Sequence, residues 1–259
     1  MRRAQAGDIV LLVSDHEKRQ LLRQLEPGRR FETHRGFLEH DKLIGQPLGS
    51  MVRTHLGFPY FLLLPSTADL IQNIRRNSQT IYAKDAGYLA LKLGVVPGSR
   101  VIEAGAGSGA MCTVFAALVG DEGHVYSYDV REDMLDTTRK NLEWVGLADR
   151  VTLQQHDAIE GFSQEDIDAV FLDMPEPWLA LRAARAALRG GGMLATIVPT
   201  VNQLGQIIDA LQTSREFGLI EAEELLLRSY RTIPTRVRPN DQMVGHTGFL
   251  VFARAVVRE

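Results

Sequence analysis

Seven consecutive residues, Glu103 to Gly109, have the types and spacing to hold a nucleotide-like ligand. They read Glu-Ala-Gly-Ala-Gly-Ser-Gly, so that glycine stands at every second position from Gly105. The apolar run at 99–102 predicts a strand before them, and the pattern at 110–118 predicts a helix after them. Glycines let the backbone turn tightly and approach a ligand where any side chain would collide. The segment therefore predicts a ligand-binding strand–turn–helix unit.

The spacing of these glycines separates two kinds of ligand. A dinucleotide fingerprint has the form G-x-G-x-x-G, whereas Gly105, Gly107 and Gly109 alternate behind the acidic Glu103. This form resembles motif I of the S-adenosylmethionine (SAM) methyltransferases. The resemblance implies SAM as the cofactor and a Rossmann-like class I methyltransferase sheet.

Four acidic residues stand at or just beyond the ends of predicted strands, and ligands bind at the carboxyl ends of the strands in an open α/β sheet. Glu103 ends the first such strand and Asp173 the fourth. Asp129 ends the second, where a carboxylate can accept hydrogen bonds from both hydroxyls of a ribose, and Asp157 follows the third, where it can accept from an adenine amine. Each alone has a structural alternative, because loop aspartates close turns and cap helices. Four acidic residues at the ends of successive strands favour ligand binding over this alternative.

A second motif, Asp173-Met-Pro-Glu-Pro-Trp178, narrows the resemblance. With the glycine loop it resembles the bacterial-type (TrmI-like) tRNA (adenine-58-N1)-methyltransferases. Ala83 departs from the family, which commonly has proline there, and we expect altered loop stiffness from it. Further segments that resemble the family, in order along nearly the whole chain, are 33–36 with 40–41 and 44–45, 81–86, 198–204, and 238–239 with 245–250.

The resemblance implies methylation of N1 of a T-loop adenosine in tRNA by a homotetramer. Adenine N1 is a weak neutral nucleophile, and its methylation leaves a cationic base. A carboxylate beside this edge can accept a hydrogen bond from the N6 amine as the charge develops, and we expect Asp173 in this role. Tyr82 is expected near the cofactor or the base, with a buried structural tyrosine as the alternative. The expected cofactor-binding residues are Glu103, Gly105, Ala106, Gly107, Ser108, Gly109, Asp129, Asp157 and Asp173.

Other side chains carry weaker expectations. Trp178 could stack on a base or pack under its loop. Two basic groups could contact RNA phosphates or simply be solvated, and a cluster of histidines is expected to organise turns or meet RNA rather than bind a metal. The basic groups are Arg228, Arg231, Arg236 and Arg238, then Arg29, Arg30, Arg35 and Lys42; the histidines are His16, His34, His40 and His55.

The elements that must position these residues form two expected domains. Residues 1–65 read as a β-rich module for RNA or oligomer contacts, mildly basic with 10 Lys and Arg against 7 Asp and Glu in the first 60. Residues 66–259 are the expected catalytic domain. From residue 99 strands and helices alternate, with a helix expected at 132–145, a strand at 151–155 and a strand at 193–198 after the three glycines at 190–192. This alternation predicts a parallel, doubly wound α/β sheet. Two closing apolar segments, 219–227 and 248–257, are expected as an antiparallel pair at its edge.

Composition excludes some classes of protein. Of 259 residues, 45% are hydrophobic and 24% charged, as in ordinary globular domains. No apolar stretch approaches the roughly 18 residues that a membrane span needs. The single cysteine, Cys112, excludes an internal disulfide and fits a reducing cytoplasm. A SAM-dependent protein carboxyl- or amide-methyltransferase and a non-catalytic tRNA-binding subunit stay as alternatives, which cofactor binding and the acceptor would separate.

Overall fold

The computed structural model describes residues 1–14, 20–76 and 80–257, so that His16 lies outside the described residues. The chain forms two compact units, Met1–Asn73 and Ile74–Glu259. Among the described residues, no helix has the length and apolar character needed to cross a membrane.

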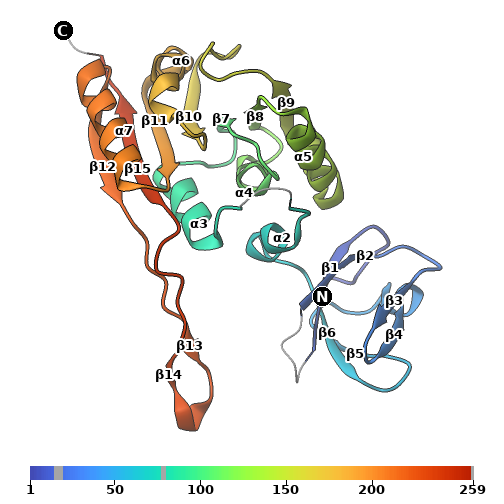
Figure 1. Cartoon of the computed structure of the whole chain (residues 1–259). Helices are drawn as coiled ribbons and strands as arrows, with labels where there is room; N and C mark the ends of the chain where they lie inside the picture. The colour runs from blue at the N-terminus through green and yellow to red at the C-terminus, as the bar shows by residue number, and fades with distance from the viewer. Residues whose placement is uncertain (15–19, 77–79, 258–259) are drawn as a thin grey trace. The chain divides into compact units, whose positions relative to one another are not determined.

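The first unit is a small β module (Figure 1). Its antiparallel sheet has the strand order β2-β1-β6-β5, and β3 and β4 form a separate hairpin. Alternate residues of the sheet point inward, as a half-buried strand requires, and Val10, Leu12 and Leu62 lie in the core with Phe31. The elements are β1 Ile9–Ser14, β2 Gln20–Gln24, β3 Arg30–Thr33, β4 Gly36–Glu39, α1 His40–Leu43, β5 Met51–Arg53, β6 Pro59–Leu63 and α2 Thr67–Asn73.

The second unit is built on a seven-stranded sheet with the order β12-β15-β11-β10-β7-β8-β9. The five strands from β11 to β9 run parallel, and β15 lies antiparallel between β11 and β12. The strands are β7 Arg100–Ala104, β8 His124–Asp129, β9 Val151–Gln155, β10 Ile167–Leu172, β11 Leu188–Val198, β12 Phe217–Glu223 and β15 Phe249–Ala255. The helices are α3 Ala83–Lys92, α4 Ala110–Val119, α5 Glu132–Val145, η1 Ala148–Arg150, η2 Pro177–Ala180, α6 Leu181–Ala187 and α7 Val201–Ser214.

The core of this unit explains its apolar strands. Strands β7 and β10 are the central pair of the sheet and lie under helices, so Ile102 and Val170 are fully buried. A cluster of buried side chains joins β10 and β11 to α6 and α7, where Ile207 and Leu211 supply the inner face of α7. The sheet therefore holds its strand ends, and the loops that follow them, on a rigid base.

The predicted alternation of strands and helices from residue 99 is confirmed, as is the antiparallel pair at the sheet edge. The strand expected after Gly190-Gly191-Gly192 begins earlier, because β11 starts at Leu188. The three glycines lie in an irregularity of the β10–β11 pairing, where Ile167 opposes Leu188 and Ala169 opposes Met193. This is a bulge of the kind that glycine accommodates in a strand. The β3–β4 hairpin was not predicted.

An arm leaves the sheet between β12 and β15 (Figure 1). It contains the short antiparallel pair β13 Tyr230–Arg231 and β14 Arg238–Pro239, with the 3-10 turn η3 Pro234–Arg236 between them. The predicted basic run falls on this arm. Arg231 and Arg238 are both ion-paired with Asp241, which lies just beyond the run.

Candidate active site

The glycine loop after β7 is shaped first by the protein's own packing. Gly105 has φ +96°, and a Cβ there would lie 1.9 Å from the backbone oxygen of Asp173. Gly109 has φ +79°, and its Cβ would lie 2.9 Å from Cγ2 of Thr138. A side chain at either position would push the loop away from the sheet or from α5. Gly105 thus lets the loop pack on the Asp173 segment, and Gly109 lets it pack on α5.

Helix α5 braces the loop from the other side. The amide of Asn141 donates to the carbonyl of Ser108 at 2.9 Å and to that of Arg75 at 2.9 Å. Its oxygen accepts from the backbone N–H of Arg75 at 3.0 Å. The hydroxyl of Thr138 donates to the carbonyl of Gly107 at 3.1 Å. Sequence reasoning missed Asn141, whose only signal was a polar residue on the buried face of a predicted helix.

Asp129 lies beside this loop, as its position at the end of β8 predicted. Its Oδ2 accepts from the backbone N–H of Gly107 at 3.1 Å, and its Oδ1 accepts from that of Arg131 at 2.9 Å. Each carboxylate oxygen has a further lone pair. The carboxylate is therefore fixed at the sheet edge and retains the capacity to accept from ligand hydroxyls.

Glu103 is buried inside the sheet, with 1% of its surface exposed. The hydroxyl of Ser127 on β8 donates to its Oε2 at 2.5 Å. Burial raises the pKa of Glu103 to about 8, with smaller contributions from the charges of Asp173 and Asp129. Glu103 is therefore largely protonated at neutral pH. Its expected cofactor contact stays a prediction.

Asp157 follows β9 and closes the turn there. Its Oδ1 accepts from the backbone N–H of Ile159 at 2.9 Å, and its carbonyl accepts from that of Glu160 at 3.0 Å. This is the turn-closing use that loop aspartates commonly have. Its contact with an adenine amine stays a prediction.

A cavity of about 180 Å³ brings Asp173 and Tyr82 together. Asp173 follows β10, and its backbone N–H donates to the carbonyl of Ala104 at 2.8 Å, which ties it to the end of β7. The protein around its carboxyl group raises the pKa to about 6, and the charge of Asp129 adds to the rise. The lining residues are Thr80, Ile81, Tyr82, Asp85, Asp173, Ile197, Pro199 and Thr247.

Two charged residues under this cavity had no role assigned from the sequence. Lys84 and Asp85 open helix α3, and Nζ of Lys84 donates to Oδ1 of Asp85 at 2.7 Å. The same Nζ donates to the hydroxyl of Thr247 at 2.6 Å, which links α3 to the segment before β15. In the sequence these two residues are visible only as a charged pair next to Tyr82. The partner of Lys84, Thr247, is 163 residues further along the chain.

Trp178 packs against the core cluster of the second unit, so the packing interpretation holds for it. In the first unit, predicted basic residues pair with nearby acids: Arg29 with Glu26, Arg30 with Glu32, and Lys42 with Glu39. These pairs lower the charge that the module offers to phosphate.

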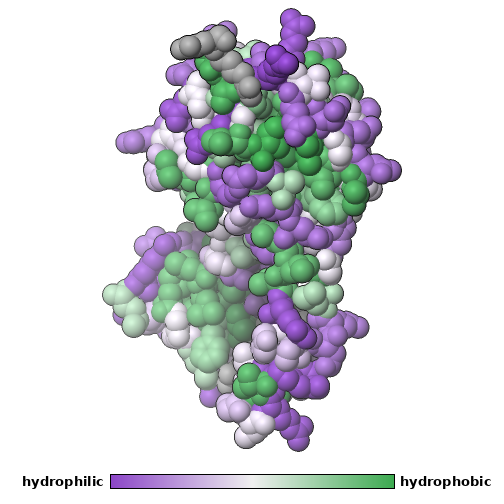
Figure 2. Space-filling model, turned by 90° about the vertical axis from the view of Figure 1, so that its left-hand side faces the viewer, coloured by the Kyte–Doolittle hydropathy of each residue, from purple (hydrophilic) through white to green (hydrophobic). Residues whose placement is uncertain are grey.

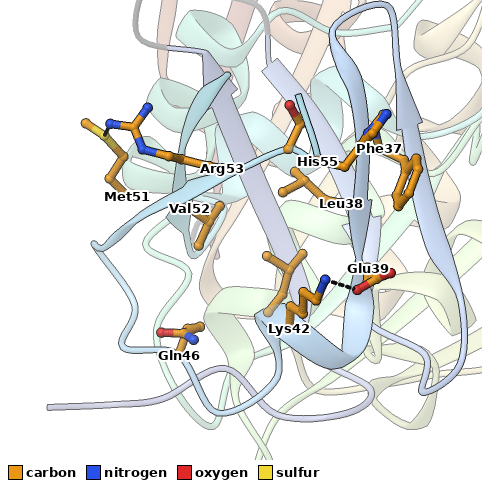
Figure 3. Close-up of a pocket in the computed structure, with 11 residues that line it drawn as sticks. Phe37, Leu38, Glu39, Lys42, Gln46, Met51, Val52, Arg53 and His55 are labelled. Carbon is orange, nitrogen blue, oxygen red and sulfur yellow. Dashed lines mark hydrogen bonds and ion pairs between the residues drawn. The ribbon is translucent and has the colours of Figure 1, made fainter. Parts of the chain in front are cut away.

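The described histidines of the first unit include two that organise turns. Nδ1 of His40 accepts from the backbone N–H of Glu26, and Nδ1 of His55 accepts from that of Phe37, both at 2.9 Å. His55 also stacks on Phe37, with ring centroids 4.0 Å apart. Phe37 and His55 line a second pocket of about 260 Å³ within this unit, and the ion pair between Lys42 and Glu39 lies at the same pocket (Figure 3).

The parallel sheet, the glycine loop after β7 and the carboxylate at the end of β8 define a SAM-dependent methyltransferase. The chain belongs to the family described as the tRNA methyltransferase complex GCD14 subunit, whose profile matches residues 57–238. A profile for the TrmI-like N-terminal region matches residues 4–52.

Individual relatives agree with this membership over nearly their whole lengths. The chain is 32% identical to tRNA (adenine(58)-N(1))-methyltransferase TrmI of Thermus thermophilus, over 94% of this chain and 96% of that protein. The crystal structure of tRNA (m1A58) methyltransferase TrmI from Aquifex aeolicus superposes with a TM-score of 0.84 at 32% identity, over 99% and 100% of the two chains. A Thermotoga maritima structure described as a SAM-dependent O-methyltransferase has a TM-score of 0.90 at 39% identity, over 99% and 96%.

Proposed function

We propose that this chain is a tRNA (adenine-58-N1)-methyltransferase that uses SAM. The observation that carries the proposal is the position of Asp173. Its backbone oxygen packs on Gly105 of the cofactor loop, and its side chain lines the cavity next to that loop. A group so placed is at the boundary between the methyl donor and the acceptor. The activity named for the Thermus and Aquifex relatives supports the same reaction.

The loop after β7 fits the cofactor. A Cβ at Gly105 would meet the backbone oxygen of Asp173, and a Cβ at Gly109 would meet the side chain of Thr138. Asp129 is held by the amide of Gly107 and keeps lone pairs that can accept from a ligand. Residues 103–109, Asp129 and Asp157 would hold SAM, which supplies an electrophilic methyl group on its sulfonium sulfur. The protein's part is to bind and align the reactants.

Asp173 acts on the acceptor. Above its pKa of about 6 the carboxylate accepts a hydrogen bond from the N6 amine of adenine. As N1 gains the methyl group, positive charge spreads onto that amine, and the hydrogen bond strengthens. Tyr82, 45% exposed at the start of α3, offers the base an aromatic face in the same cavity. A T-loop adenosine has to leave its stack to reach this cavity.

The test is methyl transfer to unmodified tRNA transcript, with modified nucleosides mapped by mass spectrometry. N1-methyladenosine at position 58 that is lost in Asp173→Ala supports the proposal. A second candidate, O-methyl transfer, follows from the description of the Thermotoga structure. Methylation of an isoaspartyl peptide, with none of tRNA, would favour that candidate. Failure to bind SAM would favour a non-catalytic tRNA-binding subunit.

We also propose that the chain acts in the cytoplasm as a homotetramer on tRNA. The arm exposes several apolar side chains, and Leu219 is exposed on the edge strand β12. Contact with other subunits would remove this apolar surface and the unpaired strand edge from water. Figure 2 shows hydrophobic side chains among hydrophilic ones on the side where α7 and β12 lie. Light scattering after gel filtration would give the subunit number, and Ile233→Asp in the arm should reduce it. The exposed arm residues are Leu226, Leu227, Tyr230, Ile233, Val237, Met243 and Val244.

A further inference from the structure

The cavity at Asp173 contains a second carboxylate that the proposed reaction has not used. Asp85 is fully buried, and its Oδ1 accepts from Nζ of Lys84 at 2.7 Å. Among the described residues its Oδ2 has no hydrogen-bond partner, although Asp85 lines the cavity. A buried polar atom without a partner costs free energy. Because Asp85 lines the cavity, a ligand there that carries a donor would satisfy this atom.

The ligand of this cavity is the methyl acceptor. The described lining residues come from the start of α3, from Asp173, from the end of β11 and from the segment before β15. None of the described lining residues belongs to the glycine loop or to the end of β8, where Asp129 lies. Within the described part of the chain, the cavity therefore meets the cofactor loop only through Asp173, whose backbone oxygen packs on Gly105. Its volume, about 180 Å³, is below the roughly 300–1,000 Å³ of sites for drug-sized ligands and suits one flat ring system.

The charges around Asp85 determine what kind of group it can accept. Nζ of Lys84 donates to both Asp85 and Thr247, and its side chain is 9% exposed. The ammonium group is thus engaged by the protein, and the carboxylates of Asp85 and Asp173 are the charged acceptors among the described lining residues. A base with an amine opposite them is bound, whereas a base with a carbonyl there meets two acceptors.

We propose that Oδ2 of Asp85 accepts one N–H of the target adenine's N6 amine while Asp173 accepts the other. This inference rests on the proposed function. It assigns adenine specificity to the pair of carboxylates, because N6 of adenine is a two-proton donor and O6 of guanine is an acceptor. A site whose buried acceptors stay unpaired rejects the wrong ligand strongly.

The test compares wild-type protein with Asp85→Asn on two tRNA transcripts, one with adenosine and one with purine riboside at position 58. Purine riboside keeps N1 and lacks the 6-amine. Single-turnover rates are measured for each pair, with SAM affinity from calorimetry. Asp136→Asn, the same change at an exposed ion pair on α5, is the matched control. Because Asp85→Asn leaves Lys84 without its anion, the double variant Lys84→Met/Asp85→Asn is measured as well.

We expect Asp85→Asn to slow methylation of adenosine by roughly 10- to 100-fold, with SAM affinity unchanged and with less than about a threefold effect on purine riboside. The double variant should show the same dependence on the 6-amine. Equal losses on both transcripts would assign Asp85 a structural role and overturn the inference. Weaker SAM binding would assign it to the cofactor, with the same consequence.

Failure of the inference is distinguishable from failure of the proposed function. If wild-type protein forms N1-methyladenosine and Asp85→Asn forms it at the same rate, the inference alone is overturned. If wild-type protein forms none, the proposed function falls and the inference falls with it.

Discussion

Replacement of Asp173 by asparagine tests the chemistry most directly. The change keeps the shape of the side chain and one carbonyl acceptor, and it removes the negative charge. Asp173 lines the cavity, and desolvation of its carboxyl group by surrounding protein, with the charge of Asp129, raises its pKa to about 6. Loss of one group that stabilises transition-state charge commonly costs about 10²–10³ in rate. We expect a loss of this size in Asp173→Asn.

The wild-type rate should also depend on pH with a defined sign. A carboxyl group with a pKa of about 6 is about nine-tenths ionised at pH 7 and about one-tenth ionised at pH 5. Only the ionised form accepts the amine proton with full charge. The single-turnover rate should therefore fall about tenfold between pH 7 and pH 5, and this decline should be absent from Asp173→Asn.

The assay is transfer of a radiolabelled methyl group to tRNA transcript with enzyme in excess, from pH 5 to pH 8. Asp136→Asn, at an exposed ion pair with Arg139, controls for the loss of an acidic residue. An Asp173→Asn rate within about threefold of the wild-type rate would refute the role of Asp173. Persistence of the pH 6 limb in the variant would assign that titration to another group.

Three further predictions concern the loop and its support. Gly105→Ala should abolish SAM binding in calorimetry, because its Cβ would lie 1.9 Å from the oxygen of Asp173, whereas Gly205→Ala, with open space around its Cβ in α7, should be tolerated. Glu103→Gln should change how stability depends on pH, because a pKa raised to about 8 in the folded protein gives stability that is lost as pH rises. In urea unfolding, the wild-type free energy of unfolding should fall relative to that of Glu103→Gln by about 1.4 kcal/mol per pH unit between pH 5 and pH 8. Parallel plots of unfolding free energy against pH for the two proteins would contradict this. Asn141→Ala should weaken SAM binding and lower stability by about 1–3 kcal/mol, because its hydrogen bond to the loop carbonyl of Ser108 and its two hydrogen bonds to the backbone of Arg75 are lost. An unchanged dissociation constant would show that the loop keeps its conformation without Asn141.

Some parts of the fold were predictable because their cause is local. The helix from Glu132 to Val145 was predicted at its observed bounds, since acidic residues open it and the left-handed Gly146 ends it. Strand β9 was predicted as well. The hairpin of β3 and β4 was not, because its four-residue strands carry little apolar periodicity and are held by pairing with each other.

Within the site the same division holds. From the sequence alone one could predict that the glycine loop, Asp129 and Asp173 follow strand ends at one edge, because a parallel sheet places its strand ends there whatever the details of its packing. The three-dimensional packing was needed to show that the oxygen of Asp173 leaves room only for glycine at 105, and that Glu103 is buried. It also decided the meeting of Lys84 with Thr247. Long-range contacts of this kind depend on how whole elements pack, and no local spacing in the chain encodes them.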